Sequence, residues 1–264
     1  IAAFGKLTGK NGGGLRKVSA DNTSKMITGY KEKSEYISKN GVTSTVYLMD
    51  CMEGMKQLER NENMLAVVDP PYGIGVGSMG YTNGVAMVGN ALAKRKDYRT
   101  ENKWDNGTPD KIYFDELIRV SKNQIIWGGN YFADKLYPSK GFIVWDKRCD
   151  DNMTNSFSDC EYAWCSIGNG KMFRFLWNGM LQGDMKNKEQ RFHPTQKPVK
   201  LYDWIFANYA KPNDKILDTH LGSGSSRIAA ERAGLNFIGF ELDADYYHAQ
   251  EKRFKNHVSQ LTLF

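Results

Sequence analysis

Short apolar segments alternate with segments of helical spacing along most of the chain, and this alternation limits its fold more than any other feature. Seven apolar runs have the length of buried strands: residues 46–49, 64–68, 124–127, 142–145, 162–165, 215–217 and 237–240. Segments with helical spacing lie at residues 113–120, 198–209, 225–232 and 244–255. Strands that alternate with helices predict an α/β fold, in which a mostly parallel, seven-stranded sheet has helices on both faces.

The first 44 residues differ from the rest in composition. They are rich in Gly, Lys, Ser, Asn and Thr, and their apolar residues are isolated and follow no period. We therefore expect residues 1–44 to form a basic, flexible arm and residues 45–264 to form one folded domain. The composition of the arm fits a tether to nucleic-acid phosphates and a solvated tail equally well.

Composition also limits the setting and the partners of the chain. No run of eighteen apolar residues occurs, so we expect neither a membrane-spanning helix nor a membrane partner. The four cysteines form no Cys-x-x-Cys pair, which predicts a reduced, cytoplasmic setting, and we expect no metal site. The 36 basic and 30 acidic residues give a net charge of +6, which suits a polyanionic partner but is also common among enzymes.

One motif stands at the end of the second apolar run, where Asp69 is followed by Pro70, Pro71 and Tyr72. The two prolines stiffen the backbone and donate no hydrogen bonds, so their carbonyl groups are free to face a ligand. A carboxylate and a fixed carbonyl can accept the two N–H groups of an amino group, while an aromatic ring stacks on the heterocycle that carries it. The motif thus predicts a clamp for a flat, amino-bearing heterocycle.

A second motif joins the last two apolar runs. The strand that ends at Asp218 leads through Gly222 and Gly224 into a helix, and the next strand ends at Glu241. The glycines let the backbone approach a ligand at the helix N-terminus, and an acid at the end of the following strand can bind ribose hydroxyls. Because the dinucleotide pattern Gly-x-Gly-x-x-Gly is not met, we expect a nucleoside ligand without a pyrophosphate.

Together these motifs resemble those of the amino-group DNA methyltransferases, the adenine-N6 and cytosine-N4 family that uses S-adenosylmethionine. Residues 69–72 are similar to its catalytic motif, and residues 218–226 to its cofactor loop, usually written Asp-Pro-Phe-x-Gly-Ser-Gly-Thr-Thr. Residues 193–198 resemble the segment that lines the methionine end of the cofactor, and residues 48–53 the segment whose acid reaches its adenine. The resemblance covers roughly residues 45–255, and the motif order is similar to the circularly permuted β-type of the family.

The resemblance implies a Rossmann-like methyltransferase fold for the folded domain, with S-adenosylmethionine as cofactor. It implies that the catalytic residues are Asp69, Pro70, Pro71 and Tyr72. It also implies a larger set of cofactor-binding residues: Asp50, Cys51, His193, Thr195, Lys197, Asp218, His220, Gly222, Gly224, Ser225, Ser226, Glu241 and Leu242. For Asp50 the residues themselves leave open the simpler role of starting the helix that follows it.

The chain departs from the family pattern in two ways. Thr219 and His220 stand where the family has Pro-Phe, so an imidazole replaces part of the apolar floor under the cofactor, and two serines replace the two threonines. No separate target-recognition domain lies between the motifs. Sequence selectivity must therefore come from the long loops at residues 73–110 and 178–197, from a partner, or be slight.

The resemblance implies methylation of adenine N6 in double-stranded DNA, with the base flipped out because its amino group is out of reach in the stack. Asp at the first motif position favours adenine in this family, but cytosine N4, an RNA substrate and an inactive nucleic-acid-binding module stay open. Four cations follow the catalytic motif and suit either DNA phosphates or a solvated face: Lys94, Arg95, Lys96 and Arg99. The sequence leaves open the oligomeric state, including a homodimer, the recognition sequence and a restriction partner.

Overall fold

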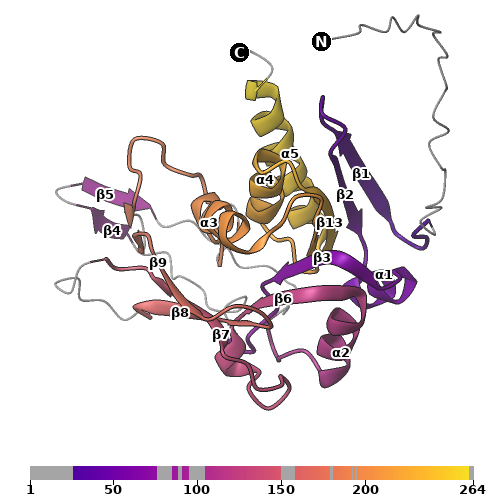
Figure 1. The fold of residues 1–264 in the computed structure, drawn as a ribbon. Helices are drawn as coiled ribbons and strands as arrows, with labels where there is room; N and C mark the ends of the chain where they lie inside the picture. The colour runs from indigo at the N-terminus through magenta and orange to yellow at the C-terminus, as the bar shows by residue number, and fades with distance from the viewer. Residues whose placement is uncertain are drawn as a thin grey trace, which may run out of the picture.

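The computed structural model describes residues 26–75, 85–88, 91–94, 105–149, 158–178, 181–191, 193 and 195–261 (Figure 1). Its strands are β1 (Glu32–Ile37), β2 (Thr43–Leu48), β3 (Asn61–Val68), β4 (Val85–Val88), β5 (Ala91–Lys94), β6 (Ser121–Trp127), β7 (Gly141–Asp146), β8 (Cys160–Cys165), β9 (Gly170–Arg174), β10 (Trp177–Asn178), β11 (Leu181–Gln182), β12 (Lys215–Asp218) and β13 (Asn236–Glu241). Its helices are α1 (Cys51–Gln57), α2 (Lys111–Val120), α3 (Val199–Tyr209), α4 (Ser225–Arg232) and α5 (Ala244–Leu261), with a 3-10 turn, η1, at Gly129–Tyr131. The predicted α/β fold is confirmed.

Nine of the described strands form one sheet, in the order β1-β2-β13-β12-β3-β6-β8-β7-β9. From β2 to β6 all neighbours pair in parallel. β1 joins β2 in an antiparallel pair, β8 is antiparallel to both β6 and β7, and β9 is parallel to β7. The sheet is mostly parallel, as predicted, and all seven predicted strands lie in it.

The predicted count of seven strands is wrong, because the sheet has two further strands, β1 and β9, at its edges. None of the residues of β1 or β9 is fully buried. An edge strand pairs through its backbone on one side only, so it does not need the apolar run that marks a central strand. Hydrophobic pattern alone therefore misses both edges.

The boundary between arm and domain also differs from the prediction. Residues 32–44, expected in the flexible arm, contain β1 and the start of β2, and β2 pairs with β13 in the sheet. The side chain of Asn236 anchors the start of β2, where its Oδ1 accepts the Thr43 N–H over 2.9 Å. The folded domain thus begins before residue 45, whereas residues 1–25 lie outside the described residues.

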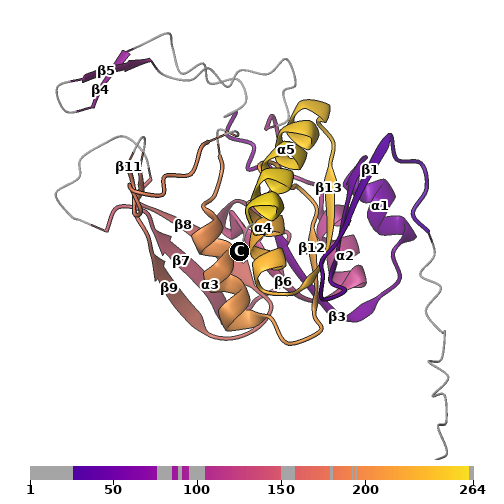
Figure 2. The ribbon, with the colours of Figure 1, turned by 90° about the horizontal axis from the view of Figure 1, so that it is seen from above.

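Helices cover both faces of the sheet, with α1 and α2 on one face and α3, α4 and α5 on the other (Figures 1 and 2). β3 shows how the strands serve both layers: Leu65 and Val67 join the core under α3–α5, and Met64, Ala66 and Val68 join the core under α1 and α2. No helix in the described part of the chain combines the length and apolar character needed to cross a membrane.

Parallel pairing brings the ends of three strands to one edge of the sheet. β12 lies between β3 and β13, with Leu217 opposite Ala66 and Asp218 opposite Gly239. Because the three strands run in the same direction, the acid that follows or ends each of them lies at the same edge. This edge is where ligands bind in open α/β sheets.

A buried arginine joins the β1–β2 hairpin to the two C-terminal helices. Arg227 of α4 is fully buried and forms an ion pair with Glu251 of α5. Its guanidinium also donates to Ser44 Oγ over 2.9 Å and to Gln250 Oε1 over 3.1 Å, and it lies 3.8 Å from the ring centroid of Phe254. One side chain thus ties α4 and α5 to β2, although Ser44 lies 183 residues before Arg227 in the sequence.

Replacing Arg227 with Leu should lower the free energy of unfolding by about 3–5 kcal/mol, because Glu251 would stay buried without its partner. Urea denaturation measures this loss. The control is Arg232→Leu, since the Arg232 side chain is 46% exposed in its pair with Asp203 and should contribute less than about 1 kcal/mol. Equal losses in the two variants would contradict a stabilising role for the buried pair.

Candidate functional site

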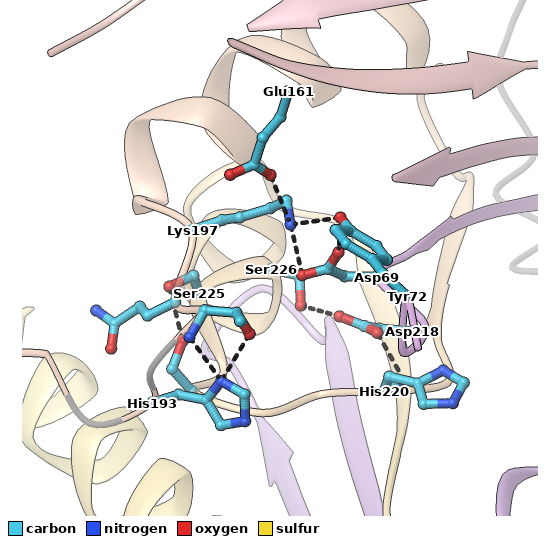
Figure 3. A network of polar contacts seen from close by, with 12 residues as sticks. Asp69, Tyr72, Glu161, His193, Lys197, Asp218, His220, Ser225 and Ser226 are labelled. Atoms are coloured by element: carbon cyan, nitrogen blue, oxygen red, sulfur yellow. Dashed lines mark hydrogen bonds and ion pairs between the residues drawn. The ribbon is translucent and has the colours of Figure 1, made fainter. Parts of the chain in front are cut away.

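Lys197 lies at the centre of a polar cluster at the carboxyl edge of the sheet (Figure 3). Its Nζ is 2.5 Å from Asp69 Oδ2, 3.1 Å from Glu161 Oε2 and 3.2 Å from the Tyr72 hydroxyl. The Tyr72 hydroxyl donates to Asp69 Oδ1 over 2.6 Å. The four side chains come from the end of β3, from β8 and from the segment before α3, so only the folded chain brings them together.

Burial and neighbouring charges act in opposite directions on this cluster. Burial raises the pKa of Asp69, Lys197 lowers it and Glu161 raises it, and the pKa ends above its ordinary value. Burial lowers the pKa of Lys197, but the two carboxylates outweigh burial and hold that pKa above its ordinary value. Burial opposes ionisation of Glu161 too, yet Lys197 and Lys147 hold its pKa below the ordinary range. Lys197 is therefore a cation shared by two acids.

The turn after β6 holds the ring of Tyr72. Gly128 has a φ of 74°, which favours glycine, and a Cβ at this position would overlap the Tyr72 ring. Tyr131 of η1 stacks on Tyr72, with ring centroids 5.0 Å apart and planes 15° apart. The side of Tyr131 that faces outward is accessible, since this residue is 41% exposed. The turn thus fixes the aromatic wall of the predicted clamp.

Buried acids hold both ends of the glycine turn between β12 and α4. Asp218 accepts hydrogen bonds from Ser226 Oγ over 2.5 Å and from the His220 N–H over 3.1 Å. Glu241 accepts the Gly222 N–H over 2.7 Å. Burial raises the pKa of each acid to about 7. The turn is thus fixed by two carboxyl groups that are costly to ionise.

His193 and Thr195 lie beside this turn. Gly222 and Gly224 have φ values of 52° and 73°, and a Cβ on Gly222 would point at the His193 ring from 3.8 Å. His193 Nδ1 lies 3.0 Å from Thr195 Oγ1. Burial, followed by the charge of Lys197, lowers the pKa of His193 to about 3, so its ring is neutral.

His220 packs against α2. Its ring centroid lies 5.4 Å from that of Tyr113, with the planes at 71°. Thr219 Oγ1 bridges the two residues, 2.6 Å from the Tyr113 hydroxyl and 3.0 Å from His220 Nδ1. Burial lowers the pKa of His220 to about 4. The imidazole that replaces the family's phenylalanine is thus a neutral, flat group in an aromatic setting.

The structure brings the start of α1 next to Glu241, because Leu48 pairs with Glu241 in the sheet. Asp50 is exposed and caps α1 by accepting the Met52 N–H over 2.7 Å, which is the simpler of its two predicted roles. Burial raises the pKa of the neighbouring Cys51 to about 12, so its thiol stays protonated. The ligand roles of Asp50 and Cys51 stay predictions.

Two groups of predicted site residues are placed differently or lie outside the described residues. The resemblance grouped Lys197 with the cofactor set, whereas its ammonium contacts Asp69 in the structure. Lys94 ends β5, but its side chain and residues Arg95, Lys96 and Arg99 lie outside the described residues. Their contact with DNA phosphates stays a prediction.

Three charged residues of this region lie outside the sequence motifs: Glu161, Glu189 and Arg253. Glu161 is an acid within an apolar strand, and such a residue signals a buried partner. Arg253 of α5 donates to Ser223 O and Ser225 Oγ, each over 2.9 Å, and pairs with Glu189 over 2.7 Å. This pair links the segment at residues 181–191 to the glycine turn, and no local pattern in the sequence marks it.

The residues around the glycine turn fit a nucleoside-type cofactor. A carboxylate oxygen can accept two hydrogen bonds, so Glu241 keeps acceptor capacity for ribose hydroxyls besides its backbone contacts. The two glycines present no side chain on the turn, and Leu242, 65% exposed, supplies an apolar surface beside Glu241. The pairing of β12 with β3 sets this site next to the Asp69 cluster.

Comparison with known proteins identifies a family and a fold. A family model for DNA methylases of the N6/N4 type matches residues 110–252, more than half of the chain. The Type II methyltransferase M.HinfI of Haemophilus influenzae is 24% identical over 253 residues, which cover 82% of this chain and 69% of that protein. The Type II methyltransferase M1.MboII of Moraxella bovis is 23% identical over 250 residues, with coverages of 76% and 92%.

A solved structure shows the same architecture. The PvuII DNA methyltransferase, described as cytosine-N4-specific, superposes with a TM-score of 0.54 and 14% identity over 86% of this chain and 90% of that one. At this level of identity the likeness concerns the fold alone. The α/β sheet of this chain therefore has the Rossmann-like methyltransferase fold.

The pKa of Asp218 predicts how stability depends on pH. In the folded chain this pKa is about 7, against about 3.9 in an unfolded chain. Between these two pH values the folded state keeps a proton that the unfolded state has lost. The contribution of Asp218 to the free energy of unfolding is therefore fully present below about pH 4 and is lost as the pH rises through about 7. The free energy of unfolding of the wild type should therefore fall between pH 5 and pH 8. In Asp218→Asn this fall should be smaller by about 1–3 kcal/mol, because the amide does not ionise.

Urea denaturation at both pH values measures this difference. Asp134→Asn, which removes an exposed carboxylate, is the matched control and should keep the wild-type pH dependence. If Asp218→Asn and Asp134→Asn lose the same stability between pH 5 and pH 8, Asp218 does not titrate as its burial requires.

Proposed function

Since the chain belongs to the N6/N4 family of DNA methylases, we propose that this DNA methyltransferase acts on the N6 amino group of an adenine flipped out of double-stranded DNA. The observation that carries the proposal is the position of Asp69 and Tyr72 at the carboxyl edge of β3, next to the glycine turn after β12. The amino group of a stacked base cannot reach a buried carboxylate, so the base must leave the duplex.

The methyl donor is S-adenosylmethionine, which supplies a reactive methyl group on a positively charged sulfur. Glu241 would accept its ribose hydroxyls, and the backbone at Gly222 and Gly224 would lie against it. His193 and Thr195, beside the same turn, would line its methionine end. The neutral state of His193 supports this role, since a second positive charge would repel the sulfonium.

The chain's own contribution to the chemistry lies in orientation and hydrogen bonding. The amino nitrogen of adenine is a poor nucleophile because its lone pair is delocalised into the ring. Asp69 and the Pro70 carbonyl would accept its two N–H groups and favour a tetrahedral nitrogen with a localised lone pair. Tyr72, held by Gly128 and Tyr131, would stack on the base and fix its plane. Orientation of the two reactants and the negative charge of Asp69 would supply most of the rate enhancement.

The preference for adenine over cytosine rests on Asp at the first position of the catalytic motif. The clamp itself accepts either amino group, because adenine N6 and cytosine N4 both present two N–H groups on a flat ring. Methylation of cytosine N4 would therefore correct the base named in the proposal and leave the clamp mechanism unchanged. Identification of the methylated nucleoside separates the two bases.

The test is to incubate the protein with plasmid DNA and isotope-labelled S-adenosylmethionine, digest the DNA and identify the labelled nucleoside by mass spectrometry. We expect N6-methyladenine with the wild type and loss of methyl transfer with Asp69→Ala. The variant should fall below a tenth of the wild-type kcat, a difference of more than about 1.4 kcal/mol. Its cofactor affinity, measured by calorimetry, should stay within a few-fold because Asp69 faces the base. Residual activity above that level would contradict the clamp.

Cofactor binding is tested at Glu241. Glu241→Ala should weaken S-adenosylmethionine binding by about 1.5–3 kcal/mol, because it removes a charged acceptor of ribose hydroxyls. Calorimetry on the free protein measures this loss without DNA. Glu231→Ala, which removes a half-buried carboxylate paired with His257 at the C-terminal end of α4, is the control. Wild-type affinity in a folded Glu241→Ala variant would place the ribose elsewhere.

A further inference from the structure

The ammonium of Lys197 is held from two sides by acids of different strands. Asp69 Oδ2 lies 2.5 Å away and Glu161 Oε2 3.1 Å away, and the Lys197 side chain is only 3% exposed. The rings of Tyr72 and Trp127 lie 5.6 and 5.3 Å from Nζ by their centroids, which favours a cation at this position. A buried ammonium in such a setting stays where its two acids hold it.

Both oxygens of Asp69 are engaged by fixed donors. Lys197 contacts Oδ2, and the Tyr72 hydroxyl donates to Oδ1 while it accepts from Lys197. These three contacts close a ring that fixes the plane of the carboxylate. Each oxygen still has a free lone pair for an incoming N–H group.

Glu161 sets the charge of this ring. Without it, Asp69 and Lys197 would form a neutral pair, and Asp69 would be a weak proton acceptor. With it, the three groups Asp69, Lys197 and Glu161 carry one net negative charge, which the Lys147 ammonium on the far side of Glu161 offsets in part. Lys147 contacts the other oxygen of Glu161 over 3.1 Å and has a side chain that is 16% exposed. The cluster therefore runs from the catalytic acid toward the protein surface.

We propose that Glu161 and Lys197 are positioning residues for Asp69: Lys197 fixes the carboxylate, and Glu161 balances the ammonium so that Asp69 accepts the proton released by the methylated amino group. This inference rests on the proposed function. It adds to the clamp a proton acceptor whose strength is set by a residue outside the sequence motifs.

The step balances within the site. Methyl transfer forms a bond from the amino nitrogen to the methyl carbon, and the electron pair of the broken carbon–sulfur bond stays on sulfur. The positive charge has then passed to the nitrogen, which gives one of its two protons to an Asp69 oxygen. Asp69 becomes neutral, Lys197 keeps its proton, and Asp69 returns the proton to water after the product leaves.

Besides Tyr72, Lys197, Glu161 and Lys147, three further ionisable groups among the described residues face Asp69, and none of these three is a cation. Asp69 interacts electrostatically with groups on three neighbouring elements: Asp218 of β12, Tyr113 of α2 and Tyr202 of α3. Burial raises the pKa of both tyrosines well above the ordinary value, so they stay neutral. Asp218 adds negative charge when ionised. Glu161 and Lys147 are thus the residues whose removal shifts the charge at Asp69 without touching the clamp.

The experiment compares Glu161→Gln with Lys147→Met in the full chain. The apparent pKa of Asp69 is read by carboxyl 13C NMR in protein labelled at the aspartate side chain, with Asp69→Asn used to assign the signal. Glu161→Gln should lower this pKa, because Lys197 is then balanced by Asp69 alone. Lys147→Met should raise it, because a cation is lost beside Glu161. Glu231→Gln, which removes a half-buried carboxylate paired with His257 at the C-terminal end of α4, should leave it unchanged.

Methyl transfer supplies a second measurement. In single-turnover reactions with DNA, Glu161→Gln should slow transfer by roughly tenfold to a hundredfold, which is less than the roughly 10²–10⁴-fold of a whole general base because Asp69 itself stays in place, and it should move the acid limb of the pH profile to lower pH. Cofactor affinity should not change. Glu161→Asp, which keeps the charge, should recover the Asp69 titration and part of the rate.

An active wild type in which Glu161→Gln and Lys147→Met both leave the Asp69 titration and the pH profile unchanged would overturn the positioning role alone. Absence of methyl transfer by the wild type would instead contradict the proposed function, and with it this role for Asp69. If Glu161→Gln does not fold, Lys147→Met and Glu161→Asp still decide, because the first must raise the pKa of Asp69 and the second must preserve it.

Discussion

The parallel pairing of β12 with β3 and β13 is the constraint on which the site depends. Because the three strands run together, Asp69, Asp218 and Glu241 lie at one edge of the sheet. A slip of one residue in β12 would turn Asp218 to the opposite face and break its bond to Ser226. The cofactor turn and the base clamp are thus neighbours by register, although some 150 residues separate their motifs in the sequence.

The sequence predicts those parts of the molecule that depend on local pattern. Central strands such as β3 and β6 are buried on both faces, so their sequences are apolar runs. The position of an acid at the end of such a run marks Asp69 after β3, Asp218 in β12 and Glu241 in β13 as candidate site residues. The hydrophobic pattern does not predict β1, because four of its six residues are polar and it lies at an edge of the sheet. β1 belongs to the sheet because its backbone pairs with β2, and the spacing of apolar residues does not predict backbone pairing.

The contacts of Lys197 and Glu161 could not be predicted because they join segments far apart in the sequence. Lys197 belongs by motif to the segment with His193, and the resemblance grouped both with the cofactor. The segment before α3 instead turns Lys197 toward β3, while His193 stays beside Gly222. Glu161 reaches the same ammonium because β8 returns antiparallel beside β6. Only the three-dimensional arrangement of these strands shows that one lysine serves two acids.

The carboxylate of Asp69 is balanced by a fixed cation, whereas the acids at the glycine turn are not balanced in this way. Asp69 is bonded through both oxygens before any base arrives, so an incoming amino group shares these oxygens and need not displace Lys197. At the glycine turn no cation among the described residues contacts Asp218 or Glu241 as Lys197 contacts Asp69, and burial raises the pKa of both to about 7. Ionising them without a ligand costs stability. A ligand that donates hydroxyls to Glu241 would offset part of that cost, so the burial that makes Glu241 costly to ionise would also strengthen the binding of such a ligand.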